Sequence, residues 1–286
     1  MLIKRNVLLF FRDRASVFFS LLGALLILML YVLFLGDMLE AGLRAGLGFD
    51  SPYIRPAMAS IILAGMVAVT SVTSCTGAME TRVDDREGAG KDFLTSPISR
   101  GKLSRGYMLG SAVIGLIMTL LILGLSLIYI AAIGGGVPGL MDWALLAVTV
   151  ALSVLCANAM MFFLTAFVKT SAAFASLSAV IGALIGFIMG VYIPVGTLPD
   201  AVQWVVRLFP MSHAASMFRQ ILSDGPLQTL FAGAPPEVLG EFQALYGIVF
   251  HYGGFVSSFW FSAAFLAAAT VVFYALSVIV MRRQRG

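Results

Sequence analysis

The chain has 286 residues, of which 60% are hydrophobic and 11% charged, with a formal net charge of +4. Together with a mean hydropathy of +1.00, this composition excludes an ordinary soluble domain. Cys75 and Cys156 lie in apolar stretches without metal-ligand spacing, so we interpret them as reduced packing residues and expect no metal site.

Six apolar stretches are each long enough to cross a hydrocarbon core of roughly 30 Å as a helix. None of them contains Lys, Arg, Asp, Glu or His, and we place them at 15–36, 56–79, 107–133, 143–167, 173–193 and 257–281. In lipid, backbone hydrogen bonds are satisfied by helices or closed barrels, and these runs are too long for barrel strands. The sequence therefore predicts an all-α polytopic membrane protein, with residues 1–286 forming one transmembrane domain.

Basic residues are sorted between the two sides of these spans. Fourteen of the 18 lysines and arginines fall on one side, and the exceptions are Arg44, Arg55, Arg207 and Arg219. Because Lys and Arg next to spans stay cytoplasmic, we expect both termini inside and a multi-pass location in the cell's inner (cytoplasmic) membrane. Basic membrane-facing loops also account for the positive net charge, so no nucleic-acid partner is expected.

The first 14 residues alternate apolar side chains with Lys4, Arg5, Arg12 and Arg14. This mixture suits a short helix that lies along the cytoplasmic interface, in contact with membrane lipids, before the chain enters the first span.

Hydroxyl side chains crowd the inner half of the second span, among them Thr70, Thr73 and Ser74. Side chains of this kind either line a polar cavity or bond to their own backbone carbonyls, and the sequence leaves both interpretations open.

The fifth span carries a stripe of small residues at every fourth position: Ser178, Gly182, Gly186 and Gly190. Small residues let two helix backbones approach closely in lipid. The stripe is consistent with an ordinary intrachain helix contact, a translocation path or a subunit interface.

The segment 194–256 is long, lies outside and is too apolar for a disordered loop. Prolines cut it into pieces too short to cross, among them Pro194, Pro199 and Pro210. We therefore expect short extracellular helices that cap the bundle before the last span. A seventh span within 241–256 is the alternative, and its shortness disfavours it.

The cytoplasmic loop 80–106 is the most charged segment, and residues 86–99 within it read REGAGKDFLTSPIS. This run resembles the loop between spans two and three of the type-2 ATP-binding-cassette exporter permeases. In that family a Glu-Gly pair opens a short helix and a Leu-Thr-Ser-Pro-like run closes it. Residues 193–199, Phe209-Pro210 and the later Arg219 are similar to the family's exit from span five.

The resemblance implies a non-catalytic permease subunit of the bacterial multidrug, lipid or peptide export type. Two copies or two homologues would form each transporter. A separate cytoplasmic ATPase would bind ATP and Mg, and it would dock on the loop of this chain, which would form the coupling helix. The coupling residues here would be Glu87, Gly88, Lys91, Asp92, Phe93, Leu94, Thr95, Ser96 and Pro97. By the same analogy, spans two and five line the substrate path.

Arg219 has two interpretations. The resemblance implies an outer arginine that holds the short helices or meets substrate. The plainer alternative is a side chain that snorkels at the interface and bonds to nearby carbonyls.

The residues themselves also bear on the energy source. Ion-coupled carriers normally carry ionisable groups inside the membrane, and the predicted spans have none. The chain lacks a phosphate-binding loop as well, because Gly90-Lys91 is followed by Asp92 rather than Ser or Thr. We therefore expect outward transport of amphipathic cargo by alternating access, powered by a partner. A polysaccharide or a teichoic-type glycolipid is the alternative cargo. An intramembrane enzyme or a passive channel is the alternative class of protein.

Overall fold

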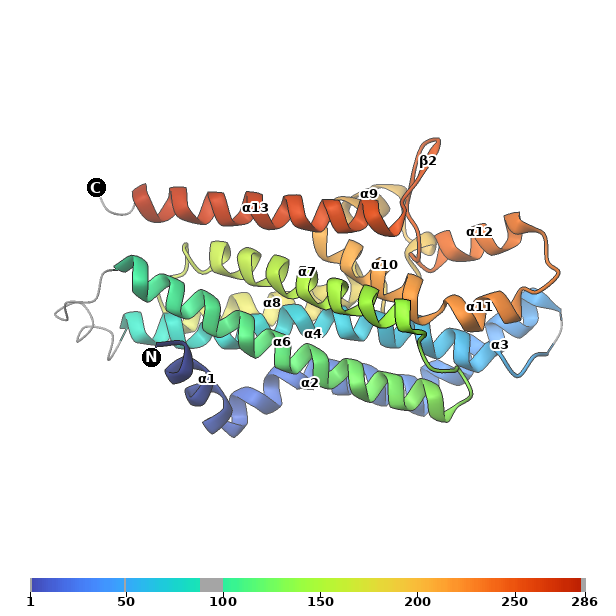
Figure 1. Cartoon of the computed structure of the whole chain (residues 1–286), viewed down its shortest axis with the longest axis horizontal. Helices are drawn as coiled ribbons and strands as arrows, with labels where there is room; N and C mark the ends of the chain where they lie inside the picture. Colours follow the sequence, from blue (N-terminus) through green and yellow to red (C-terminus); the bar gives the residue numbers. More distant parts are fainter. Residues whose placement is uncertain (1, 49, 88–99, 284–286) are drawn as a thin grey trace.

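The computed structural model describes residues 2–48, 50–87 and 100–283 (Figure 1). Six helices in this part of the chain are long and apolar enough to cross a membrane, which confirms the all-α, multi-pass fold. Their bounds are Arg14–Leu47 (α2, a π-helical turn η1 and α3 in succession), Ile54–Glu87 (α4), Arg100–Ala132 (α6), Leu140–Leu164 (α7), Ser171–Ile188 (α8) and Phe259–Arg283 (α13).

Shorter elements complete the fold. They are α1 (Leu2–Arg12), the 3-10 turn η2 (Val195–Thr197), α9 (Asp200–Leu208), α10 (Pro210–Leu222), α11 (Asp224–Leu230), α12 (Pro236–Leu245) and the strands β1 (His251–Tyr252) and β2 (Phe255–Val256). The expected short helices of 194–256 are thus present, and a two-stranded hairpin, which we did not expect, projects from the side of the bundle (Figure 1). A seventh span is absent from this described segment, since its longest helix is α10 with 13 residues.

The first membrane helix is longer than the sequence predicts. It continues from α2 (Arg14–Leu30) through η1 (Tyr31–Leu35) into α3 (Gly36–Leu47), where a loop was expected. Its outer part therefore contains charged residues. Glu40 is buried, and its carboxylate oxygens lie 3.7 Å from a guanidinium nitrogen of Arg55 and 3.8 Å from one of Arg44. Hydropathy indicates where a helix leaves lipid, not where the helix ends. The helix continues beyond residue 36 because good helix formers such as Leu39, Glu40 and Ala41 follow.

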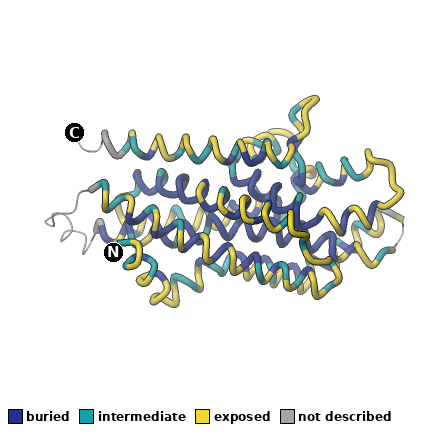
Figure 2. Tube along the Cα trace, in the orientation of Figure 1, coloured by how far each residue is buried: buried dark blue, intermediate teal, exposed yellow. Residues whose placement is uncertain are grey.

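Helix α4 forms the centre of the bundle. It is buried along almost its whole length, whereas α13 is largely exposed (Figure 2). Helices α2, α6, α7, α8 and α10 all pack against it. The fit is close on the α6 side, where a Cβ added to Gly115 would lie 2.6 Å from the Sγ atom of Cys75. Both cysteines are buried free thiols.

The helix ends that the charge pattern assigns to the cytoplasm lie together. The start of α1, the end of α4, the start of α6, the end of α7 and the end of α13 are all at one end of the bundle, at the left in Figure 1. We call this the inner end. Helices α3, α11 and α12 lie at the opposite, outer end.

Candidate functional site at the inner end of the bundle

Helix α1 is amphipathic and packs one face on the bundle. Asn6 and Phe10 are buried, while the apolar Leu8 and Leu9 are exposed. Asp13 then ends α1 and caps α2, because its carboxylate accepts hydrogen bonds from the backbone N–H groups of Ala15 and Ser16. The Ser16 hydroxyl also donates to it, and these bonds lower the pKa of Asp13. The turn fixes α1 against the inner ends of α4 and α6.

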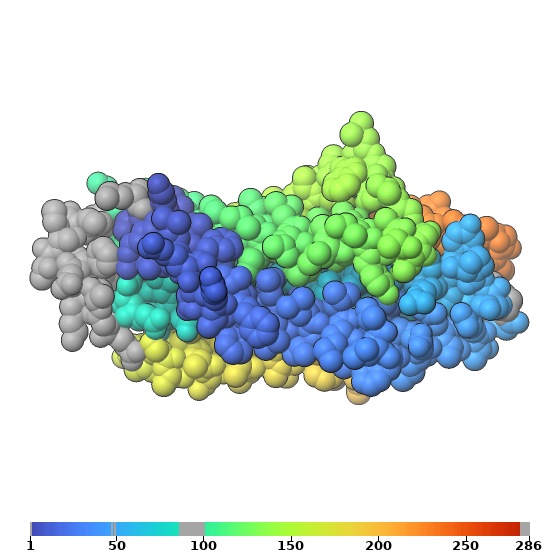
Figure 3. Space-filling view, turned by 90° about the horizontal axis from the view of Figure 1, so that it is seen from below, coloured from blue at the N-terminus to red at the C-terminus, as the bar shows by residue number. Residues whose placement is uncertain are grey.

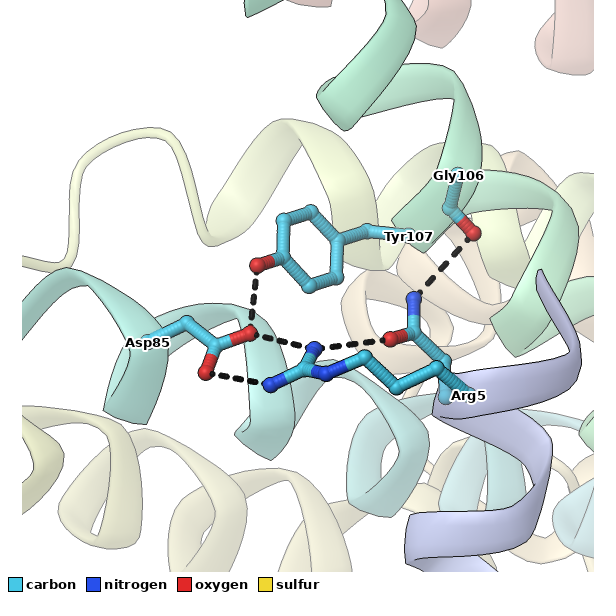
Figure 4. Close-up of polar contacts among 5 residues, drawn as sticks. Arg5, Asp85, Gly106 and Tyr107 are labelled. Atoms are coloured by element: carbon cyan, nitrogen blue, oxygen red, sulfur yellow. Dashed lines mark hydrogen bonds and ion pairs between the residues drawn. The ribbon is translucent and has the colours of Figure 1, made fainter. Parts of the chain in front are cut away.

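An ion pair joins α1 to the end of α4 (Figure 4). The Arg5 guanidinium donates two hydrogen bonds to the Asp85 carboxylate, with N–O distances of 2.9 and 3.0 Å. The Tyr107 hydroxyl at the start of α6 donates to the same carboxylate, and the Asn6 amide donates to the Gly106 carbonyl at 3.3 Å. Bidentate charge-assisted bonds are short and directional. The Arg5–Asp85–Tyr107 cluster therefore ties three helices together, two of which lead into and out of residues 88–99.

Two further contacts fasten the last turns of α4 to other helices. Arg82 is buried, donates to the Phe162 carbonyl at 3.0 Å and to the Thr165 hydroxyl at 2.6 Å, and lies over the Phe162 ring. On the other side, the Ser171 hydroxyl at the start of α8 donates to Asp84 at 2.6 Å. The inner end of α4 is thus connected to α1, α6, α7 and α8 at once.

Of the predicted coupling residues, Glu87 alone falls within the part of the chain that the structure describes. Glu87 is the last residue of α4. The others lie outside the described residues, namely Gly88, Lys91, Asp92, Phe93, Leu94, Thr95, Ser96 and Pro97. The structure therefore places only the start of the coupling segment, at the end of α4, and its description resumes at Arg100, where α6 begins.

The predicted hydroxyl residues of α4 divide into two groups. Thr70 and Ser74 are buried and bond to carbonyls of their own helix, at Met66 and Thr70 respectively. Thr73 donates to the Ser20 carbonyl of α2 at 3.0 Å as well as to the Thr70 carbonyl of its own helix at 3.4 Å, and it lines a groove. Both interpretations of the hydroxyl-rich stretch therefore apply, and at Thr73 they apply together.

That groove runs between α2, α4 and α8 and has a volume of about 700 Å³. In Figure 3 the inner half of α4 is visible at the surface between α1 and α2 on one side and α8 on the other. Thr73, Ser178 and Gly182 all line the groove. The second and fifth spans, which the resemblance assigns to the substrate path, thus face one cavity.

The small-residue stripe of α8 does not form one continuous helix contact. A Cβ added at Gly182 would meet no described atom within 4 Å, so this position faces open space. At Gly186 a Cβ would collide with the Tyr192 ring. Gly190 lies beyond the end of α8 with a φ of +62°, a conformation that favours glycine.

Arg219 on α10 is the largest fully buried side chain of the described residues and lies beneath the outer helices. It donates to four backbone carbonyls, those of Met189 (2.6 Å), Gly190 (2.9 Å), Ile61 (3.3 Å) and Gly247 (3.3 Å). Met189 and Gly190 follow the last turn of α8, where the helix dipole favours a cation. The carbonyl bonds of the plainer interpretation are therefore present, but the guanidinium is enclosed by protein and does not reach the surface as a snorkelling side chain would.

The predicted prolines occupy the starts of the outer elements. Pro194 precedes η2, Pro199 precedes α9 and Pro210 is the first residue of α10. The first turn of a helix tolerates proline because its N–H groups have no partner within the helix. These three prolines therefore stand where η2, α9 and α10 begin.

Sequence reasoning missed the roles of Arg5, Asp85 and Tyr107. Arg5 counted as one basic residue of an interfacial helix, and Asp85 and Tyr107 were assigned to a loop and a span. A usable signal was the placement of an acid and a hydroxyl on either side of the coupling segment.

Comparison with known proteins agrees with this architecture. A family model described as ABC-2 type transporter matches residues 1–223, which run from α1 through α10. No curated protein matches the chain. The matched region includes the Arg5–Asp85–Tyr107 cluster, the groove and Arg219.

Proposed function

Because the chain belongs to the ABC-2 type transporter family, we propose that it is the permease subunit of an ATP-driven exporter that moves amphipathic cargo outward. Members of this family are membrane components of transporters and generally work with a cytoplasmic ATPase. The inner end of the bundle would face the cytoplasm, in the inner membrane, as the positive-inside rule requires.

The observation that carries this proposal is the Arg5–Asp85–Tyr107 cluster. It joins the surface helix α1 to both helices that flank residues 88–99. A displacement of that segment by a docked ATPase would therefore act on α1, α4 and α6 together rather than on one loop. Since α4 is the central helix of the bundle, its movement would reach the groove that it lines.

The energy source would lie in the partner. ATP and Mg would bind to the ATPase, and this chain would supply the docking segment Glu87–Pro97 and the path. A second copy or a homologue would complete the transporter. Nucleotide can drive alternating access only if it binds one conformation of the assembly more tightly than the other.

The groove supports amphipathic cargo rather than a polysaccharide. Its walls combine apolar side chains such as Phe19, Leu26 and Phe174 with the hydroxyls of Thr73 and Ser178. A volume of about 700 Å³ is in the range of sites for drug-sized ligands. A lipid-linked or drug-like molecule matches this mixture better than a hydrated sugar chain does.

The proposal is tested by reconstitution. The chain is co-expressed with candidate ATPase subunits, the complex is purified through a tag on this chain, and the partner is identified by mass spectrometry. Inside-out vesicles with the complex should take up a fluorescent amphiphile only when ATP is hydrolysed. Uphill uptake by this chain without an ATPase would contradict the proposal, and so would labelling of residues 88–99 from the extracytoplasmic side.

A further inference from the structure

We propose that the groove between α2, α4 and α8 selects amphipathic cations, with an ammonium group held at Glu80 and an apolar body between α2 and α8. This inference rests on the proposed function and adds the chemical class of the cargo. It goes beyond the sequence analysis, which found no charged side chain in the predicted spans.

The apolar part of the site consists of facing side chains from three helices. Phe19 and Leu26 come from α2, Val69 from α4, and Phe174 and Ile181 from α8. Phe19 is 66% exposed in the chain, so a large apolar surface is open to a ligand here.

Polar groups in the groove are few, and one lacks a partner. The Ser178 hydroxyl oxygen is shielded from solvent and has no hydrogen-bond partner among the described residues. The Thr76 hydroxyl, by contrast, is occupied by the Val72 carbonyl. Buried polar atoms normally have partners, and the Ser178 hydroxyl is an exception among the described residues that line the groove.

The charged residues in the described lining of the groove are both acidic. Asp13 and Glu80 line it, whereas Lys, Arg and His are absent from its described lining. Asp13 is committed to the cap of α2, where it accepts three hydrogen bonds. Glu80 is exposed to the groove and forms no ion pair with any described residue.

The nearby arginines do not neutralise Glu80. Arg5 is engaged by Asp85, and the bonds of Arg82 described above run to Phe162 and Thr165, on the α7 side of α4. A second hollow of about 380 Å³ adjoins the groove and shares Asp13 and Glu80 with it. It is also lined by Asp84 and by the paired Asp85 and Arg5. The Glu80 carboxylate thus stands where the groove opens toward the inner end, so a cation entering from that side is attracted and an anion repelled.

Three probes with one apolar body test this selectivity: the trimethylammonium, uncharged and carboxylate forms of diphenylhexatriene. Binding to the purified full chain in uncharged maltoside micelles is followed by fluorescence anisotropy. We expect the cation to bind about tenfold more tightly than the anion. Glu80→Gln should lower the affinity for the cationic probe about tenfold and change the affinity for the uncharged probe by less than twofold. Glu237→Gln on α12 makes the same chemical change far from the groove and should alter neither affinity.

Added phosphatidylcholine distinguishes the two sources of such a cation. A lipid headgroup would displace the probe, whereas a free amphiphile site would be unaffected by lipid. Equal affinity for cation and anion, or a Glu80→Gln variant that keeps the cation's affinity, would overturn the inference. In that case ATP-dependent uptake of the uncharged probe by the reconstituted complex would leave the exporter function standing. If the reconstituted complex took up none of the three probes when ATP is hydrolysed, the proposed exporter function would be overturned too.

Discussion

Arg5 and Asp85 lie 80 residues apart in the sequence and meet in a two-point ion pair at the inner end of the bundle. The pair connects the amphipathic helix α1 to the central helix α4, which lines the groove. It is partly exposed, with the Arg5 side chain 32% accessible, so solvent screens the attraction and its main effect is geometric.

Asp85→Asn should uncouple ATP hydrolysis from transport. The amide keeps the shape of the side chain but loses the negative charge that orients Arg5. It also replaces one of the two carboxylate oxygens that accept hydrogen bonds from Arg5 and Tyr107. We expect transport to fall at least fivefold while the stability in micelles falls by only about 1 kcal/mol. The measurement is the ratio of amphiphile transported to ATP hydrolysed.

Asp50→Asn serves as the control for that change, because Asp50 pairs with Arg44 at the outer end. A double-mutant cycle with Arg5→Gln checks the pairing itself, since two partners in one network give a non-additive effect. Fully additive losses would show that Arg5 and Asp85 act separately.

Tyr107→Phe should produce a milder version of the same defect. The ring still packs between α4 and α6, while one hydrogen bond to Asp85 is removed. We expect a loss of about 1 kcal/mol in the free energy of unfolding and a partial drop in the transport-to-hydrolysis ratio. A variant more impaired than Asp85→Asn would mean that the tyrosine has a role outside the cluster.

Arg219→Lys should destabilise the outer half of the bundle. Lysine has three donors on one atom and cannot reach four carbonyls that a planar guanidinium spans. Leaving buried carbonyls without donors costs about 1–3 kcal/mol each, so we expect a loss of about 3 kcal/mol and a lower melting temperature in micelles. Arg207→Lys is the matched control, since Arg207 bonds to Gln203 on the neighbouring, more exposed α9. Equal melting temperatures for the two variants would contradict the role assigned to Arg219.

Gly182→Leu should block the groove without disturbing the fold. No described atom lies within 4 Å of the added Cβ, so the side chain projects into the cavity. We expect wild-type expression and melting temperature with transport reduced more than tenfold. Gly115→Leu offers the contrast, because its Cβ would collide with Cys75, and overpacking typically costs about 1–3 kcal/mol. Normal transport by Gly182→Leu would exclude the groove as the path.

The membrane helices and their order could be predicted from hydropathy, because lipid imposes length and polarity on each span. Helix ends could not, and α3 shows why: once outside lipid, the run after Gly36 stays helical through its own amphipathic pattern. The sorting of basic residues also placed the correct helix ends together, as α1, α4, α6, α7 and α13 demonstrate.

The site was harder to predict than the fold. Thr73, Ser178 and Gly182 were singled out from composition and spacing, and they do line one groove. Glu80 was interpreted as a solvated residue at the inner end of the second span and not as a groove residue, because a carboxylate just beyond a span usually faces solvent. Pairings such as Arg5 with Asp85 depend on how helices cross in three dimensions, which periodicity along one chain does not report.

Arg219 has one further consequence, which follows from the chemical nature of its acceptors. Every partner it binds is a main-chain oxygen, and such an oxygen is present whatever amino acid stands at the position. Ile61 and Met189 can therefore be exchanged for other apolar residues while the arginine keeps all of its bonds. A saturation library should find position 219 intolerant while positions 61 and 189 accept other apolar residues, and the two acceptor glycines, Gly190 and Gly247, should stay restricted by their positive φ.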